Sequence, residues 1–281
     1  MNHAVPHRLL VVPLCLLAGC LATAAPRRPA GGDLTSPSAR PGWTLVWSDE
    51  FDRDGVPDPA KWKPEVGMVR NGELQYYTAG RKENARVEGG LLVIEARKEP
   101  FEKAGYTSAS LTTAGIASWT YGRVSVRAKV PGGRGTWPAI WMLGDAVAKV
   151  GWPSCGEIDI MEHVGYDPDK IHCTVHTNAY CWPKGTQRGR ALDVKAPNAD
   201  FHVYSMEWTA DKIDLAFDDR VVFTFTNEGK GKDVWPFDAP HYLLLNLAIG
   251  GGWGGTKGVD DAIFPCRLLV DYVRVYRAEN P

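Results

Sequence analysis

Three carboxylates fall within six residues of one apolar, strand-like segment of the sequence. The segment reads Gly156-Glu157-Ile158-Asp159-Ile160-Met161-Glu162. Successive side chains of a strand point to opposite faces, so Glu157 and Asp159 share one face while the isoleucines share the other. Glu162 joins the acidic face only if one extra residue is absorbed as a β-bulge at or near Met161. Because bulges often redirect side chains beside active sites, the segment predicts a catalytic strand.

Two carboxyl groups on one face can hydrolyse a glycosidic bond. With the bulge, Glu157 and Glu162 lie four strand steps apart, roughly 13 Å between backbones. Side chains that lean inward approach the ~5–5.5 Å at which one carboxylate attacks the anomeric carbon while the other transfers a proton. We expect Asp159 to share a proton or hydrogen bond with Glu157, which leaves Glu157 ionised and favours a protonated Glu162. The alternative is a solvated strand face, although such faces more often carry Thr, Lys or Ser.

Short alternating runs between turn signals dominate the chain from Trp43 onward, and no long 3.6-residue apolar pattern appears. Four clear examples are residues 90–96, 122–130, 213–217 and 221–225. A tight turn at Asp218-Asp219 is expected to join the last two. The pattern predicts an all-β chain of two stacked antiparallel sheets, without an internal repeat or a second domain.

The acidic segment resembles the signature E-[ILV]-D-[apolar]-(x)-E of glycoside hydrolase family 16, and its extra residue resembles the laminarinase branch. The resemblance extends over residues 47–52, 71–77, 121–123, 135–143, 175–177, 245–251, 253–255 and 270–276. It implies a β-jelly roll whose concave face is crossed by an open cleft. It also implies that Glu157 is the nucleophile, Asp159 the assisting acid and Glu162 the acid/base of a retaining endo-glycanase acting on β-1,3-glucan or mixed-linkage β-1,3/1,4-glucan.

Three other functions are compatible with the same resemblance. A relative that cleaves galactans and a transglycosylase would use the same acids, and some relatives only bind glucan at a surface. Such binding proteins usually lack one or more of the three acids, whereas this chain keeps all of them. The segment Tyr106-Thr107-Ser108-Ala109-Ser110-Leu111 lacks an arginine that many relatives carry there, which leaves the details of the sugar subsites open.

The eleven tryptophans suit a protein that stacks aromatic faces on sugar rings, although about half of them should fill the core, as expected for Trp47, Trp208 and Trp235. Trp137 and Trp141 are four residues apart, so strict alternation points both toward the cleft; core packing is the alternative for Trp141. Trp253 lies in the glycine-rich stretch 250–255, where the backbone can approach closely at the cleft edge. Trp119 and Trp182 are further candidates.

Several polar residues are also candidate sugar contacts. They are Asn71, Glu73, Arg123, His176 and Asn246. Surface solvation is the alternative for Glu73 and Arg123, and His176 is either a structural histidine or a residue near the leaving-group subsite. Asn246 interrupts an apolar strand, where an unpaired amide would cost ~1–3 kcal/mol, so it must have protein or sugar partners.

The resemblance implies no cofactor for catalysis, but it does suggest a structural calcium ion on the convex face. Gly90 would offer a backbone carbonyl and Asp271 a carboxylate, and Glu50 is a third oxygen donor. Calcium takes six to eight oxygens, so water would complete the shell.

The N-terminus has the features of an export signal. Arg8 precedes an apolar run at residues 9–18 that is too short to span a bilayer. The run ends in Leu17-Ala18-Gly19-Cys20, which resembles a lipobox. We expect a signal peptide at 1–19, lipid on Cys20, a disordered spacer at 20–42 and a catalytic domain at 43–281. The protein would then be an exported bacterial lipoprotein of the periplasm or cell surface; an ordinary signal cut near residues 22–25 would make it secreted.

Charge and cysteines limit the remaining partners. The 32 basic and 33 acidic residues give a net charge of −1, which does not indicate a nucleic acid or an anionic membrane surface, and we expect a monomer that binds β-glucan. The four cysteines beyond the leader are Cys155, Cys173, Cys181 and Cys266. A local bridge between Cys173 and Cys181 is the preferred pairing, with buried free thiols as the alternative. The absence of a CxxC pair disfavours a structural zinc site.

Overall fold

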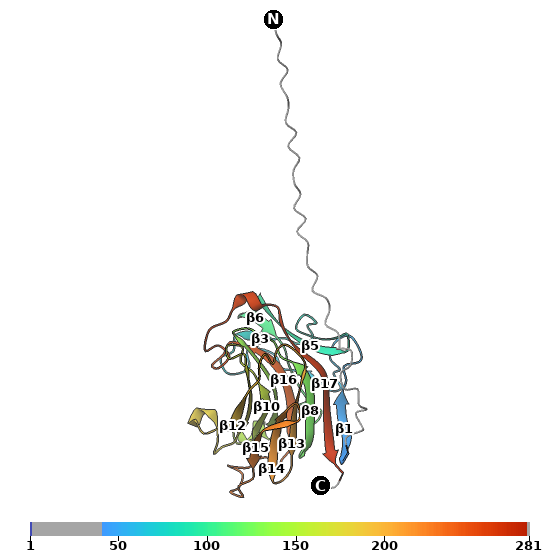
Figure 1. The fold of residues 1–281 in the computed structure, drawn as a ribbon, viewed down its shortest axis with the longest axis vertical. Helices are drawn as coiled ribbons and strands as arrows, with labels where there is room; N and C mark the ends of the chain where they lie inside the picture. The colour runs from blue at the N-terminus through green and yellow to red at the C-terminus, as the bar shows by residue number, and fades with distance from the viewer. Residues whose placement is uncertain (2–40, 280–281) are drawn as a thin grey trace.

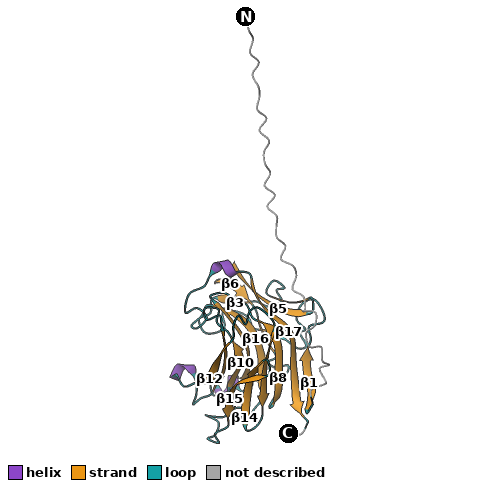
Figure 2. Cartoon of the chain, in the orientation of Figure 1, coloured by secondary structure: helices purple, strands orange, loops and turns teal. Residues whose placement is uncertain are grey.

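Strands account for nearly all the regular structure of residues 41–279, which together with Met1 are the part of the chain that the computed structural model describes (Figure 1, Figure 2). Within these residues the helices are α1 (Val147–Val150) and the 3-10 turns η1 (Trp182–Lys184) and η2 (Asp261–Ile263). None of them is long and apolar enough to cross a membrane. The predicted all-β fold is confirmed. The leader beyond Met1, Cys20 and most of the spacer lie outside the described residues.

Two sheets stack on each other, and the larger has ten strands. Its spatial order is β15 (Arg220–Thr226), β14 (Lys212–Phe217), β13 (His202–Trp208), β8 (Gly122–Lys129), β17 (Cys266–Ala278), β5 (Leu91–Phe101), β6 (Ala104–Ser108) and β3 (Gln75–Tyr77), with β1 (Trp43–Asp49) beside β17 and β4 (Ala85–Glu88) beside β5. Figure 1 shows β17 running between β1 and β8. All of these pairs are antiparallel except β3 with β6.

The smaller sheet has seven antiparallel strands. Its order is β12 (Arg188–Asp193), β11 (Lys170–His176), β10 (Glu157–Glu162), β9 (Thr136–Gly144), β16 (His241–Ile249), β7 (Ser110–Thr112) and β2 (Lys63–Pro64). One face of this sheet packs into the hydrophobic core against the larger sheet. The other face carries the three acids and is called the acid-bearing face below.

The expected turn between β14 and β15 is confirmed. Asp218 and Asp219 adopt φ angles of 46° and 61°. Two successive left-handed residues form the type I′ turn that matches the twist of a two-residue hairpin. Aspartate tolerates this region better than most residues because its short polar side chain can hydrogen-bond locally.

A β-bulge interrupts β10 where the sequence predicts it. The pairing with β9 is regular as far as Asp159 opposite Trp141, and then shifts so that Met161 lies opposite Ile140. Ile160 and Met161 are consecutive, yet both are fully buried in the core. Because the bulge absorbs one residue, Glu162 returns to the acid-bearing face, opposite Ala139 of β9.

The predicted Cys173–Cys181 disulfide is wrong. All four cysteines of the described residues are buried and unpaired. Cys173 lies in the middle of β11 and points into the core, where its thiol donates to the Ile160 carbonyl oxygen at 3.3 Å. Cys181 lies beyond that strand, at the start of η1, so the two side chains occupy different environments.

Some tryptophans lie in the core and others on the acid-bearing face. Trp208 and Trp235 are buried in the main core, as the sequence indicates. Trp47 packs edge-on against the rings of Trp62 and Trp119 at 5.6 and 5.5 Å between centroids. Trp119, which the sequence offered as a further candidate for sugar stacking, is therefore a packing residue in this structure.

Candidate active site

The three acids of β10 project from one face of the seven-stranded sheet. Asp159 is buried, with only 5% of its side chain exposed, whereas Glu157 keeps 17% exposed. Glu157 lies opposite His176 of β11, and Glu162 lies opposite His172 of the same strand. The bulge and the two flanking strands together place the acids side by side, so the sheet brings together the residues that the sequence predicts.

His176 lies against the amino-terminal half of the acid cluster. Its Nε2 atom is 3.4 Å from Asp159 Oδ2 and 3.8 Å from Glu157 Oε1. The sequence interpretation placed it near a leaving-group subsite or in a structural role. The structure instead puts its ring beside the expected nucleophile, because the antiparallel register pairs it with Glu157 rather than with Glu162.

Each glutamate accepts a hydrogen bond from a tryptophan. The indole N–H of Trp137 donates to Glu162 Oε1 at 3.0 Å, and that of Trp152 donates to Glu157 Oε2 at 3.0 Å. An indole can only donate, so the accepting oxygen must carry a free lone pair. Both contacts stabilise the ionised carboxylate and orient the two side chains.

Burial dominates the protonation of the cluster. Burial and then the Asp159 charge raise the pKa of Glu157 well above its usual range. Burial raises the pKa of Asp159 to about 8, and burial with the Asp159 charge raises that of Glu162 to about 8. A protonated Glu162 agrees with the sequence interpretation. Three neighbouring buried carboxyl groups cannot all ionise, and the upward shift in the pKa of Glu157 opposes the ionised form that the sequence interpretation expects for the nucleophile.

A chain of hydrogen bonds supports the acid-bearing face next to the acids. The indole N–H of Trp141 donates to Asn246 Oδ1 at 2.8 Å, and the Asn246 amide donates to the Tyr77 hydroxyl at 3.1 Å. That hydroxyl donates in turn to Glu73 Oε2 at 3.1 Å. The Arg70 guanidinium lies 5.1 Å from the centre of the Trp141 ring. Trp141, Asn246 and Glu73 are all buried, so they act here as internal supports that find their partners within the protein.

The glycine-rich loop at 250–255 packs directly on the tryptophan that holds Glu162. Trp253 contacts the Trp137 ring edge-on at 5.6 Å and the His172 ring at 4.8 Å. A Cβ on Gly254 would lie 2.8 Å from Trp137 Cβ, so only glycine allows this approach. The Asn71 carbonyl accepts a hydrogen bond from the Gly252 amide at 2.9 Å, which places Asn71 at the same edge.

Arg123 is not brought to this site, which corrects its prediction as a sugar contact. It belongs to β8 of the ten-stranded sheet and points to that sheet's outer face. It pairs there with Glu207, lies 3.1 Å from Asp219 and donates to Ser205. Nothing in the local sequence pattern said which of the two sheets the strand of Arg123 joins.

The three candidate calcium donors belong to the ten-stranded sheet or its edges: Asp271 lies on β17, Glu50 directly follows β1 and Gly90 directly precedes β5. Glu50 directly follows Asp49, which pairs with Val273 of β17. Gly90 is two residues before Leu92, which pairs with Val270, and Asp271 directly follows Val270. Both carboxylates accept hydrogen bonds from arginine. Glu50 accepts two from Arg274 at 3.0 and 2.9 Å, and Asp271 accepts one from Arg127 at 2.6 Å. The strand register thus makes the three residues neighbours along β17, and arginine compensates part of the charge of both carboxylates.

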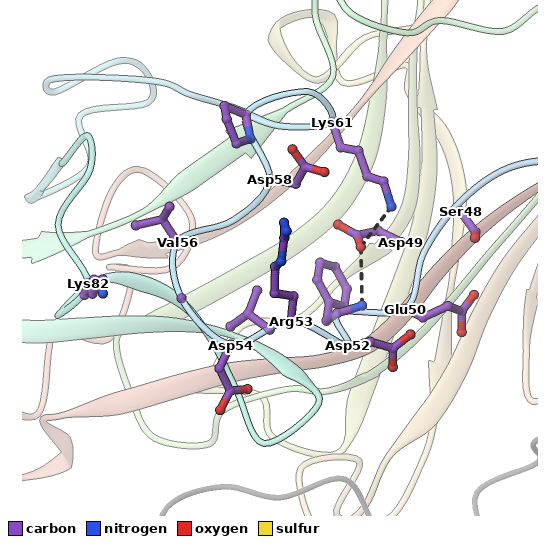
Figure 3. Close-up of a pocket in the computed structure, with 14 residues that line it drawn as sticks. Ser48, Asp49, Glu50, Asp52, Arg53, Asp54, Val56, Asp58, Lys61 and Lys82 are labelled. Carbon is purple, nitrogen blue, oxygen red and sulfur yellow. Dashed lines mark hydrogen bonds and ion pairs between the residues drawn. The ribbon is translucent and has the colours of Figure 1, made fainter.

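A separate hollow of about 610 Å³ lies beside β1, and none of the three acids lines it. Figure 3 shows Asp52, Asp54 and Asp58 around it, with Asp49 linked to the Lys61 amine and to a backbone amide. Glu50 also lines this hollow. The hollow therefore lies on the side of the molecule that carries the candidate calcium donors.

Sequence reasoning missed Trp152, Arg70 and Tyr77. Trp152 is 37% exposed and lies in the loop just before β10, in a Gly-Trp-Pro context that has no strand pattern. A tryptophan in such a loop is the same signal that singled out Trp253. Arg70 and Tyr77 offered no comparable signal, because their roles depend on contacts with residues that are distant in the chain.

Comparison with known proteins agrees with this fold and site. The profile of Glycosyl hydrolases family 16 matches residues 72–274. A β-glucanase of Rhodothermus marinus is 56% identical over 246 residues, covering 84% of this chain and 86% of that protein. The X-ray structure of the laminarinase from Rhodothermus marinus superposes with a TM-score of 0.82 at 56% identity and covers 84% of this chain and 97% of that one.

Another solved structure is also similar. The crystal structure of SCLam, a non-specific endo-β-1,3(4)-glucanase from family GH16, has a TM-score of 0.81 at 48% identity, with 85% of this chain and 93% of that chain covered. The chain belongs to glycoside hydrolase family 16, and its two sheets form the expected β-jelly roll.

The contact between Trp152 and Glu157 makes a testable prediction. In Trp152→Phe, the lost hydrogen bond removes stabilisation of ionised Glu157, so its pKa rises and the acid limb of the pH profile moves to higher pH. Loss of one hydrogen bond to a charged group at a partly exposed site should lower kcat/KM about 10-fold near neutral pH. Steady-state hydrolysis measured across pH tests this.

Trp182→Phe is the matched control, since Trp182 is 61% exposed on η1 and, within the described part of the chain, its indole donates to none of the three acids. It should retain the native profile. If Trp152→Phe loses activity equally at every pH, with no movement of the acid limb, then the indole acts only as packing.

Proposed function

We propose that the protein is a retaining endo-β-1,3-glucanase that also accepts mixed-linkage β-1,3/1,4-glucan. The observation that carries the proposal is the bulged β10 strand, which places two glutamates on one face and gives each its own indole donor. The substrate class is supported by the laminarinase and the endo-β-1,3(4)-glucanase to which the chain is similar.

In the proposed mechanism, Glu157 attacks the anomeric carbon while Glu162 gives its proton to the departing glycosidic oxygen. The bond between the sugar and that oxygen breaks as the bond to Glu157 forms, which yields a glycosyl-enzyme. Glu162, now ionised, takes a proton from water, and that water releases the sugar with retained configuration. The raised pKa of Glu162 suits the acid role, because the group stays protonated at neutral pH.

Asp159 and His176 assist from the middle of the cluster. A proton on Asp159 would remove one buried negative charge next to Glu157 and so allow Glu157 to ionise for attack. His176 Nε2, 3.4 Å from Asp159 and 3.8 Å from Glu157, offers a polar partner to both. The hydrogen bond from Trp152 acts in the same direction, since it favours the ionised form of the nucleophile.

Other functions receive less support. A protein that only binds glucan does not need three neighbouring carboxyl groups, whose burial costs free energy. A galactan substrate is disfavoured because the relatives with 56% and 48% identity are a β-glucanase and an endo-β-1,3(4)-glucanase.

Product analysis tests the reaction and its substrate. The purified protein should release short oligosaccharides from laminarin and from lichenan, detected by mass spectrometry, and none from agarose or carrageenan. Products from a galactan alone would contradict the glucanase proposal. Retained binding to laminarin without any products would favour a glucan-binding protein.

Variants of the two glutamates test the assigned roles. Glu157→Gln should abolish turnover while keeping glucan binding. Glu162→Gln should lose about 10²–10⁴-fold activity on polymer yet still react with an aryl glycoside whose leaving group needs no protonation. The wild-type rate on polymer should fall above pH 8 as Glu162 ionises, and this alkaline limb should vanish for Glu162→Gln acting on the activated substrate. Native behaviour of Glu162→Gln on laminarin would overturn the acid/base assignment.

We further propose a structural calcium ion held by the Gly90 carbonyl and by Glu50 and Asp271. The support is the strand register, which makes these residues neighbours, together with the burial of Asp271 at a bulge of β17. Arg274 and Arg127 compensate part of the carboxylate charge, so water would supply most of the remaining oxygens. The ion would stabilise the fold, and no catalytic step depends on it.

Chelation tests the calcium proposal. A ligand present at 100 times its Kd adds about 2.7 kcal/mol to stability, so its removal should lower Tm by about 5–10 °C. Scanning calorimetry with a chelator, followed by added Ca²⁺ or Mg²⁺, should show recovery with calcium alone. An unchanged Tm would exclude this ion.

A further inference from the structure

Glu157, Asp159 and His176 form a compact set of metal-ligating atoms. One carboxylate oxygen from each acid and one ring nitrogen of the histidine all lie within 4.8 Å of one another. Among the residues that the structure describes, this is the one group of three or more such side chains at that spacing. Imidazole nitrogen and carboxylate oxygen are both zinc ligands, and an open zinc site uses three protein ligands and one water.

The distances suit a tetrahedral ion. Bonds of about 2.0–2.1 Å at tetrahedral angles place neighbouring donor atoms about 3.4 Å apart. His176 Nε2 is 3.4 Å from Asp159 Oδ2 and 3.8 Å from Glu157 Oε1, and the three ligand atoms all lie within 4.8 Å of one another. Both distances from the imidazole are therefore close to the value that a shared ion requires.

Burial adds an independent observation that points to a cation. Asp159 is 3% exposed, and its Oδ2 atom faces His176 without a hydrogen-bond partner within the described part of the chain. A buried carboxylate oxygen of this kind needs either a proton or a cation. Glu157 remains 17% exposed, which leaves an approach from solvent and room for water as a fourth ligand.

The donor types select the ion. Calcium and magnesium require six or more oxygens and do not favour a site with one imidazole and two carboxylates. Zinc, copper and cobalt accept imidazole readily and tolerate low coordination numbers. The sequence alone disfavoured zinc because no CxxC pair is present, but that criterion does not detect a site built from one strand pair.

We propose that Glu157, Asp159 and His176 reversibly bind a divalent transition-metal ion of the zinc class, and that the bound ion inhibits hydrolysis. The inhibition rests on the proposed function, since the ion would engage the Glu157 lone pair needed for attack on the anomeric carbon. The binding itself does not rest on it. No electron transfer is involved, and a chelator should restore activity.

The test measures binding and activity separately on the full-length protein. Calorimetric titration with Zn²⁺, together with visible absorption of the Co²⁺ complex, should show one site of low-coordinate geometry without a thiolate band. His176→Asn should weaken binding at least about 10-fold. His172→Asn is the matched control, since His172 lies on the same strand and face but opposite Glu162, and its affinity for Zn²⁺ should match wild type.

The two variants also control for binding elsewhere. Any weak binding at His3 and His7, which lie outside the described residues, is the same in both variants. In wild type, Zn²⁺ should inhibit laminarin hydrolysis competitively, with an inhibition constant equal to the calorimetric Kd. Equal Zn²⁺ affinity of His176→Asn and wild type would overturn the site, and His176-dependent binding without inhibition would overturn its regulatory effect. Binding by a protein that hydrolyses no glucan would contradict the proposed function and leave the metal site standing.

Discussion

The acid-bearing face depends on one packing constraint in β10. Ile160 and Met161 are adjacent in sequence, yet both are fully buried in the core and together lie opposite the single residue Ile140. A regular strand would expose one of them, at a cost of about 1.5–3 kcal/mol for a large apolar side chain. The bulge removes that cost, and in doing so it turns Glu162 to the same side as Glu157. Core packing thus determines the arrangement of the catalytic carboxyl groups.

The same constraint explains the electrostatics of the site. Three carboxyl groups assembled on one strand face and shielded by aromatic side chains hold protons at a pH where free carboxylates would not. Indole donors oppose this effect at the two glutamates without adding a competing positive charge. The site therefore contains both an acid and a potential nucleophile. The Asp159 oxygen that has no hydrogen-bond partner among the described residues can take up either a proton or a cation.

The tryptophans next to the three acids are themselves held in place by contacts with neighbouring residues. Trp137 is held by Trp253 and by a loop whose glycines permit backbone contact with its ring. Trp141 is fixed through Asn246, which links it to Tyr77 and Glu73. These tryptophans, which the composition suggested for sugar stacking, thus also orient carboxylates and fill the acid-bearing face. The hydrogen-bond partner of each indole N–H determines which of the two roles that tryptophan has.

The sequence by itself determined the strand content, the Asp218-Asp219 turn, the bulge and the common face of the three acids. Each follows from patterns only a few residues long: alternation, turn chemistry and an odd spacing between glutamates. The tertiary structure decided that Arg123 belongs to the other sheet and that Cys173 forms no disulfide with another described cysteine. It also decided that His176 faces Glu157 and that Trp152 donates to Glu157. These outcomes depend on which strands become neighbours and in what register. Short-range patterns do not contain that information, because sheet pairing joins residues far apart in the chain.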